Sequence, residues 1–374
     1  MSTERCWRSA LAGAMCALLA TALPGASGAA AGPPSRHAWA QSQVTTLTMV
    51  QWPVQVPGTP YAYAVAVAPV TPTRPGGRLV RIDLVTGQLA KGPQVLSASQ
   101  LLVAGKSVAL LSPARTAANG VPQGPYSLRL ASGLNLGPAV RLGWTGQLED
   151  PVSGAGSLES GGIWLPTAEG AQLVSVSSGK VLKNLSFGAR VTGVATSPDG
   201  TLLYVSLFGP EGYPSSNTVI DEVDAGSGRV VARRGLFTVN GAALTPVPGA
   251  LWASYRTGMA GGTDLYSSTG LDPVAPPEVK AFSAVPRYGG EQIQGFSMSY
   301  LGAVVWMQSA SGVSCLSPST GSFRAGIAFS TTTNGSQAWS PFATWDGLVY
   351  AVAGIFTGPS HAVVAVRPPA TCGL

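Results

Sequence analysis

The stretch VTGVATSPDGTLLYVS, residues Val191–Ser206, contains two apolar segments separated by a short polar turn. The turn is Pro198-Asp199-Gly200, and the second apolar segment runs from Thr201 to Ser206. An Asp-Gly turn between apolar runs is typical of a β-hairpin, because glycine adopts the positive φ that a tight turn requires. An isolated hairpin is barely stable in water, so this stretch predicts further strands for it to pack against.

The composition agrees with a chain built from many short strands. Among its 374 residues are 48 glycines and 30 prolines, both of which are unfavourable inside helices. Hydrophobic residues make up 45% of the chain and charged residues only 10%, so a large core can form. We therefore predict an all-β fold in which turns separate short strands.

The N-terminal segment predicts export. Arg5 and Arg8 precede an apolar run, residues 10–23, which is followed by small residues and proline, the order found in secretory signals. Cleavage is expected either within residues 28–31 or, by preference, just before Gln41. We therefore expect a signal peptide over residues 1–40, a single domain over residues 41–374, and no membrane-spanning segment after signal removal.

Two glycine series repeat along the chain. The first is a strand ending in a Thr-Gly or Ser-Gly turn, at positions about 40 to 50 residues apart, the spacing of blades in a β-propeller. Its members are Gly87, Gly133, Gly179, Gly228, Gly270, Gly321 and, as a weaker copy, Gly373. The second is a glycine before an apolar strand that often carries Tyr or Trp. Its members are Gly58, Gly105, Gly162, Gly200, Gly249, Gly302 and Gly347.

The two series alternate strictly, which predicts a seven-bladed β-propeller with four-stranded antiparallel blades. Six or eight blades would require one of the two glycine series to be miscounted. With the strands of a blade named A to D, the glycines mark the A–B and C–D turns and serve as scaffold. The last copy stops at strand C, which would leave an open sheet edge. The strand-like segment Gln43–Met49 is expected to complete the last blade and close the ring.

The stretches SPDGTLLYVS and TVIDEVDAGSGRVV resemble the YVTN-type repeat of quinoprotein-like seven-bladed β-propellers. The resemblance is specific in the blade that begins near Val191 and weaker in the others. The copies lack the Gly-His and Trp-Asp dipeptides of WD repeats. They also lack the tryptophan that follows the Thr-Gly turn in pyrroloquinoline quinone enzymes. The resemblance therefore implies the fold rather than a catalytic subfamily.

Export also changes what the cysteines predict. Cys6 and Cys16 would leave with the signal, so Cys315 and Cys372 remain as a pair in an oxidising compartment. We predict that they form a disulfide, which would fasten the last residues to the fold and reinforce the seam between the first and last blades. Two free buried thiols are the alternative.

Chain alternation places the B–C and D–A connections on one face of the propeller, and binding residues commonly lie on such longer loops. The B–C candidates are Pro69–Gly77, Ser112–Pro125, Leu207–Asn217 and Ser254–Gly262, and the D–A candidates are Gly143–Pro151 and Pro286–Gln292. Arginine and aromatic side chains are frequent anchors in recognition surfaces. The predicted ligand-binding residues are Arg74, Arg115, Trp144, Tyr213, Tyr255, Arg256, Arg287 and Tyr288.

Residues suited to catalysis are few. After signal removal the only histidine is His361, so a site of several imidazoles is excluded and no metal site is predicted. A catalytic triad through His361 is weaker than a structural role for it. Glu149-Asp150 could hold calcium or form an acid–base pair, although two carboxylates are a weak motif. The acidic residues at 221, 222 and 224 are expected to face solvent on a strand.

These features favour an exported, non-catalytic propeller that binds a protein, peptide or glycan through its B–C and D–A face. We expect a monomer that is secreted or extracytoplasmic, without a cofactor. Nucleic-acid binding is not predicted, because the basic residues are scattered rather than gathered in a stripe. The alternative is an exported propeller enzyme, a lyase, lactone hydrolase or quinone-dependent dehydrogenase, with its site at the mouth of the central channel. An enzyme would need several titratable side chains converging there.

Overall fold

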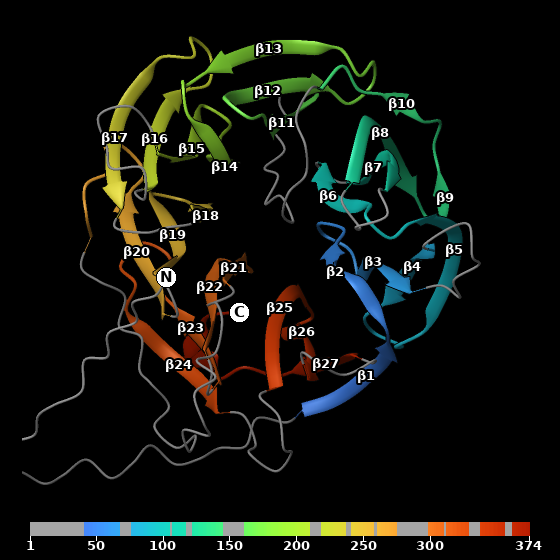
Figure 1. Ribbon diagram of the computed structural model, residues 1–374. Helices are drawn as coiled ribbons and strands as arrows, with labels where there is room; N and C mark the ends of the chain where they lie inside the picture. The colour runs from blue at the N-terminus through green and yellow to red at the C-terminus, as the bar shows by residue number, and fades with distance from the viewer. Residues whose placement is uncertain are drawn as a thin grey trace, which may run out of the picture. The chain divides into compact units, whose positions relative to one another are not determined.

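A computed structural model of the chain defines one compact unit over Trp39–Leu374. The structure describes residues 41–374 apart from eleven internal ranges. These are residues 68–75, 105–106, 117–121, 145–160, 210–217, 237–240, 258–259, 275–297, 310–311, 329–336 and 356–360, and the N-terminal residues 1–40 also lie outside the described part. The unit is all-β and forms a seven-bladed β-propeller (Figure 1).

Four blades hold four described antiparallel strands each, ordered from the inside of the ring outward. They are β2 (Met49–Gln55), β3 (Tyr61–Val67), β4 (Gly76–Asp83) and β5 (Leu89–Leu96) in blade one; β14 (Arg190–Thr196), β15 (Leu202–Phe208), β16 (Thr218–Asp224) and β17 (Val230–Leu236) in blade four; β21 (Met298–Leu301), β22 (Val304–Ser309), β23 (Gly312–Leu316) and β24 (Phe323–Ala328) in blade six; and β25 (Gln337–Trp345), β26 (Leu348–Ile355), β27 (His361–Val366) and β1 (Gln41–Leu47) in blade seven.

The other three blades depart from this count. The outer strand of blade two is divided into two short strands, and blades three and five each have three strands among the described residues. Their strands are β6 (Gln100–Ala104), β7 (Ser107–Thr116), β8 (Pro122–Ser132), β9 (Asn135–Leu136) and β10 (Val140–Arg141); β11 (Gly162–Pro166), β12 (Gly170–Ser175) and β13 (Val181–Ser186); and β18 (Ala242–Val247), β19 (Ala250–Thr257) and β20 (Ala260–Ser267). One short 3-10 helix, η1 (Ala370–Cys372), follows β27.

The hairpin around Pro198-Asp199-Gly200 is confirmed as the inner half of blade four. It consists of β14 and β15, and Gly200 has φ +75°. Asp199 Oδ1 accepts hydrogen bonds from the Ser197 hydroxyl and from Thr201, which lowers the pKa of this carboxyl. The aspartate therefore has a local role in closing the turn.

The Thr-Gly and Ser-Gly signature is explained by a turn between strands C and D. In blade one the Gly87 N–H donates to the Asp83 carbonyl (2.8 Å), and Thr86 Oγ1 accepts from the next N–H at 3.3 Å. The same pair of bonds recurs at Gly179, Gly228 and Gly321. The hydroxyl residue and the left-handed glycine are thus both turn chemistry, which confirms that these glycines are scaffold.

The aromatic residues of the B strands connect neighbouring blades. The buried Tyr204 hydroxyl donates to the Ser268 carbonyl in the C–D turn of blade five, at 2.8 Å. The indole N–H of Trp252 donates in the same way to the Pro318 carbonyl of blade six, also at 2.8 Å. Tyr63 makes the equivalent bond from blade one to blade two. A large ring with one polar end suits this position, because the ring fills the core and the tip satisfies a turn carbonyl.

The ring is closed by the N-terminal strand, as predicted. β1 pairs antiparallel with β27 from Gln41 opposite Val366 to Leu47 opposite His361. The predicted boundary, Gln43–Met49, is shifted, because Met49 already belongs to β2. Figure 1 shows β1 as the outer strand of blade seven, leading directly into blade one.

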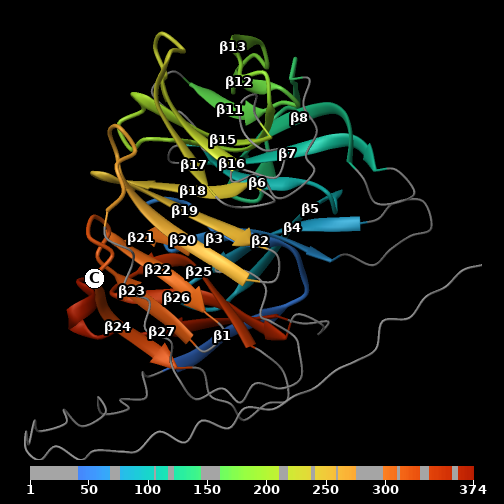
Figure 2. The ribbon, with the colours of Figure 1, turned by 60° about the vertical axis from the view of Figure 1, so that its left-hand side comes forward.

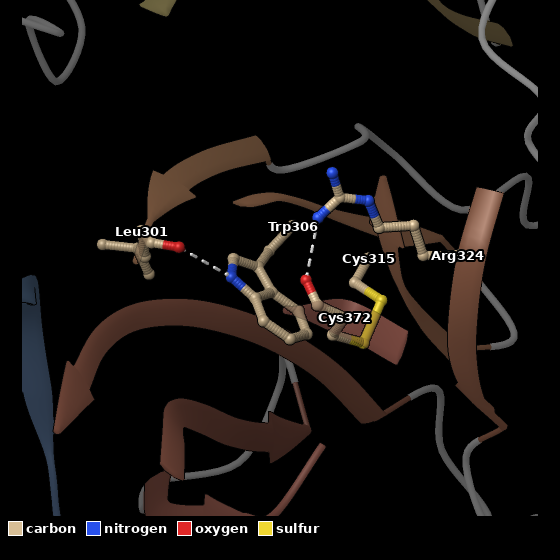
Figure 3. The surroundings of a disulfide bond; sticks show 5 residues. All are labelled: Leu301, Trp306, Cys315, Arg324 and Cys372. Carbon is tan, nitrogen blue, oxygen red and sulfur yellow. Dashed lines mark hydrogen bonds between the residues drawn. A yellow bond between two sulfur atoms is a disulfide. The ribbon is translucent and has the colours of Figure 1, made fainter. Parts of the chain in front are cut away.

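Cys315 and Cys372 lie at disulfide distance, with their Cα atoms 5.8 Å apart, and both are fully buried. The predicted location of this bond was wrong in one respect. Cys315 belongs to β23 of blade six and Cys372 to η1, so the bond ties blade six to the segment after blade seven, not to blade one. Figure 3 shows the pair beside Trp306, with Arg324 donating to the Cys372 carbonyl at 2.9 Å.

Candidate recognition face

The two ends of each blade differ in their connections. The A–B and C–D connections are short turns such as those at Gly249 and Gly321, whereas B–C and D–A connections leave from the opposite ends of the strands. Two of the four predicted B–C loops are largely strand. β7 and β8 extend to Thr116 and Pro122, and β19 and β20 leave only residues 258–259 between them. The two hairpins are lengthened at this end by antiparallel pairing.

The predicted binding residues are therefore distributed between strand and loop. Arg115 is exposed near the end of β7, opposite Gln123 of β8. Tyr255 and Arg256 lie within β19; Tyr255 is paired with Ala242, the first residue of the inner strand β18, and Arg256 lies in the part that continues beyond β18. Arg115, Tyr255 and Arg256 thus all belong to the lengthened hairpins. Four of the predicted residues lie outside the described residues, and these are Arg74, Tyr213, Arg287 and Tyr288.

Trp144 has a structural explanation and is not a candidate for ligand contact. Only 4% of its surface is exposed, and its ring lies 4.6 Å from that of Tyr126, centroid to centroid. Its indole N–H donates to the Pro166 carbonyl in the neighbouring blade at 2.8 Å. The prediction placed Trp144 in the D–A segment Gly143–Pro151, but its ring packs between blades two and three.

The inner strands are composed mainly of apolar, hydroxyl and amide residues. In β2, β6, β14, β18, β21 and β25 the sequences read MVQWPVQ, QLLVA, RVTGVAT, AALTPV, MSYL and QAWSPFATW. Arg190, the first residue of β14, is the charged side chain within these six described strands, and it is exposed at the B–C and D–A end. Sequence reasoning missed Arg190, although its position directly before an A strand was a usable signal.

A hydroxyl network joins blades four and five beside Arg190. Thr192 Oγ1 and Ser206 Oγ are 2.8 Å apart, and Ser206 Oγ also accepts from the Ala242 N–H at 2.9 Å. Thr218 Oγ1 accepts from the Gly241 N–H at 3.0 Å. A Cβ on Gly241 would lie only 2.3 Å from Thr192 Oγ1, so this close approach requires glycine. The network gives the face a rigid base at this point.

Two of the three acidic residues of β16 are buried, which corrects the prediction for Asp221 and Glu222; Asp224 is only partly buried and accepts a hydrogen bond from the Ser227 N–H in the C–D turn. Asp221 is fully buried, and its two carboxylate oxygens accept from Arg233 Nε and Nη2, both at 2.6 Å. Arg233 is the register partner of Asp221 on β17. The bidentate geometry is the strong form of this ion pair, and it is internal to blade four.

Glu222 is also buried, with 3% exposed, on the other face of β16. Its Oε2 accepts from the Gly270 N–H of blade five at 2.8 Å. Burial raises the pKa of Glu222, and the Gly270 hydrogen bond opposes that shift in part. Asp221 and Glu222 therefore hold blade four together and attach it to blade five.

Among the described residues, no three or more His, Cys, Asp or Glu side chains gather where they could hold a metal ion. His361 begins β27 opposite Leu47, and Glu149-Asp150 lies outside the described residues. No helix in the described part of the chain is long and apolar enough to span a membrane.

Comparison with solved structures identifies the same class of fold. The chain is similar to the β-propeller domain of Cps50 (Swd1) from Myceliophteria thermophila, with a TM-score of 0.52 over 87% of this chain and 99% of that one. Sequence identity is 11%, so the likeness concerns the fold alone. No family model matches the sequence. No curated protein matches it either. The chain is a seven-bladed β-propeller.

Proposed function

We propose that this chain is an exported, non-catalytic propeller of the YVTN type that binds a protein, peptide or glycan through its B–C and D–A face. One observation carries the proposal: the described inner strands consist mainly of apolar, hydroxyl and amide residues, with Arg190 as their charged residue, while the buried carboxylates of blade four are engaged in contacts between strands and blades. Recognition surfaces of this kind place arginine and aromatic anchors on a rigid scaffold.

The surface proposed for binding consists of the two lengthened hairpins and the start of β14. It brings Arg115, Tyr255, Arg256 and Arg190 to the same end of the blades. Export is supported by the N-terminal segment and by the Cys315–Cys372 pair, because disulfides persist in oxidising compartments.

The proposal is tested by screening the purified protein on peptide and glycan arrays and repeating each hit with variants. Arg115→Ala should weaken binding about tenfold, as expected for an interface anchor. Arg129→Ala is the matched control, because Arg129 is exposed on the same hairpin toward the opposite end. Equal binding by both variants would contradict a role for the hairpin end.

Native mass spectrometry separates this proposal from the enzyme alternative. The protein purified without added ligand should have the mass of the polypeptide alone. An excess of a few hundred daltons that disappears on denaturation would indicate a tightly held cofactor and argue against the proposal.

A further inference from the structure

The outer edges of blades one to four are of two kinds. β5 of blade one contains Gly92-Pro93, and the edge of blade two is divided into β9 and β10 around Gly137-Pro138. Proline and short strands are the usual means of preventing an edge from pairing with another chain. β13 and β17, of blades three and four, run for six and seven residues without proline.

These two edges also expose aliphatic side chains. Val181 and Leu182 of β13 are 37% and 53% exposed. Val230 and Val231 of β17 are 38% and 46% exposed. The two pairs occupy the same position, directly after the Ser-Gly turn, so neighbouring blades repeat one exposed apolar pattern.

Basic residues flank both pairs. Lys180 and Lys183 enclose the first, and Arg229 and Arg234 enclose the second; Lys180, Arg229 and Arg234 are exposed. We call these four basic and four aliphatic residues the basic edge. Because Arg233 is engaged by Asp221, it is not counted in this set.

The two halves of the basic edge are in contact. Lys183 Nζ donates to the Ala225 carbonyl, in the C–D turn of blade four, at 2.7 Å. A Cβ on Gly228 of that turn would meet Leu185 of β13 at 2.5 Å. Arg229 and Val230 follow this turn directly, so the surface is continuous from β13 to β17. Figure 1 and Figure 2 show β13 and β17 as outer strands of adjoining blades.

We propose that the basic edge receives an acidic, extended peptide segment of a partner, added as a β-strand alongside β17. β17 pairs with β16 and with no other described strand, which leaves one side of its backbone available for strand addition. The aliphatic side chains supply apolar contact, and the exposed cations Lys180, Arg229 and Arg234 select carboxylates. Lys183 is engaged by the turn carbonyls and joins the two strands. This surface lies on the rim and is separate from the proposed recognition face.

Charge decides between the possible occupants. A second copy would bring one basic edge against another, and each chain has a formal net charge of +6, so self-pairing is disfavoured. Lysine and arginine on an edge are also a common protection against aggregation. These cationic side chains repel a basic strand but attract an acidic one, so an acidic strand is the favoured occupant.

The experiment uses an eight-residue probe, acetyl-Ser-Glu-Val-Glu-Val-Glu-Val-Ser-amide, and the full protein in low salt, with binding followed by fluorescence anisotropy of a labelled form. We expect saturable binding that weakens as salt is raised. A probe with the same charges but N-methylated at alternate residues cannot form the backbone ladder and should bind at least tenfold more weakly. Equal binding by the methylated probe would overturn strand addition.

Two glutamate variants locate the site. Arg234→Glu should weaken binding of the probe at least tenfold, whereas Arg129→Glu, at an exposed position on blade two, should leave that binding unchanged. Arg115→Ala should also leave it unchanged, so a failure here is distinguishable from a failure of the recognition face. Equal effects of the two glutamate variants, or tighter binding to vesicles of anionic lipid than to the probe, would overturn the proposal. Circular dichroism of each variant confirms that the blades are folded.

Discussion

Blade four and blade seven are both four-stranded sheets, but they are assembled in different ways. Blade four forms from one continuous segment, residues 190–236, through successive hairpins. Blade seven takes three strands from one end of the chain and β1 from the other, and the Cys315–Cys372 bond then ties the segment after it to blade six. Gln55 of blade one adds a polar tie, donating to the Thr344 carbonyl at 2.9 Å.

The two blades differ in the interactions that stabilise them. Local hairpins pay little loop-closure entropy, whereas pairing β1 with β27 must bring distant segments together. In blade four, buried carboxylates join two strands through the Asp221–Arg233 ion pair and join blade five through the Glu222–Gly270 hydrogen bond. Blade seven uses backbone pairing and a covalent bond. The predictions below test these two arrangements, beginning with the largest expected effect.

Removal of residues 41–47 should have the largest effect. Without β1, β27 becomes an open edge and blade seven loses its connection to blade one, so we expect loss of more than about 5 kcal/mol and of the soluble monomer. A chain beginning at Gln41 keeps the strand and is the control. Thermal unfolding and size-exclusion chromatography measure the result; equal stability of the two chains would show that β1 is dispensable.

Replacement of both Cys315 and Cys372 by serine should cost about 4 kcal/mol, since the bond closes a loop over 57 residues. Denaturant unfolding of the double variant, beside the wild type with and without reductant, measures the loss. We expect the reduced wild type to match the variant. If all three unfold at the same denaturant concentration, the covalent tie does not stabilise the ring.

Removing either partner of the Asp221–Arg233 ion pair should lower stability, but by different amounts. Arg233→Met leaves Asp221 buried without its partner and should cost about 3 kcal/mol. Asp221→Asn should cost less, because the Arg233 side chain is 38% exposed and can be hydrated. Urea unfolding of both single variants and the double variant measures the coupling. A larger loss for Asp221→Asn would contradict the assignment of the buried charge.

Glu222→Gln should give the smallest effect, and its sign depends on pH. Because burial raises the pKa of Glu222, the folded state binds the proton more tightly, and this contribution to stability is lost as pH rises through the folded pKa. The variant keeps an oxygen that can accept from the Gly270 N–H. Its stability relative to the wild type should therefore increase from acidic toward neutral pH. Thermal unfolding across this range tests it, and parallel profiles for Glu222→Gln and wild type would disprove it.

The sequence was informative wherever local chemistry determines structure. The residues at Asp83, Thr86 and Gly87 specify a C–D turn by themselves, since each supplies one element of its hydrogen bonding. Repetition of that turn predicted the blade count, and the missing last strand predicted closure by β1. In blade three the left-handed residue is Gly161 rather than the predicted Gly162, an error of one position.

The recognition face was less predictable, for a physical reason visible in its residues. Whether Ser112–Thr116 forms a loop or extends β7 depends on pairing with β8, and loop composition does not reveal this. Trp144 was assigned to a binding surface from its loop position, but the packing of blade three against blade two buries it. Arg190 was missed because the predicted binding residues were sought within loop segments, whereas Arg190 is the first residue of strand β14.

What the sequence alone determined is the repeating unit: turn residues, aromatic tips and alternating glycines, each of which acts within a few residues of the chain. The tertiary structure decided which charges are buried. Alternation of polar and apolar residues along a strand indicates an exposed face and a buried face only when one face of the sheet meets solvent. Asp221 and Glu222 are consecutive in β16, so their side chains point to opposite faces of the sheet. In a propeller, neighbouring blades cover both faces of a middle strand, and both side chains are therefore buried.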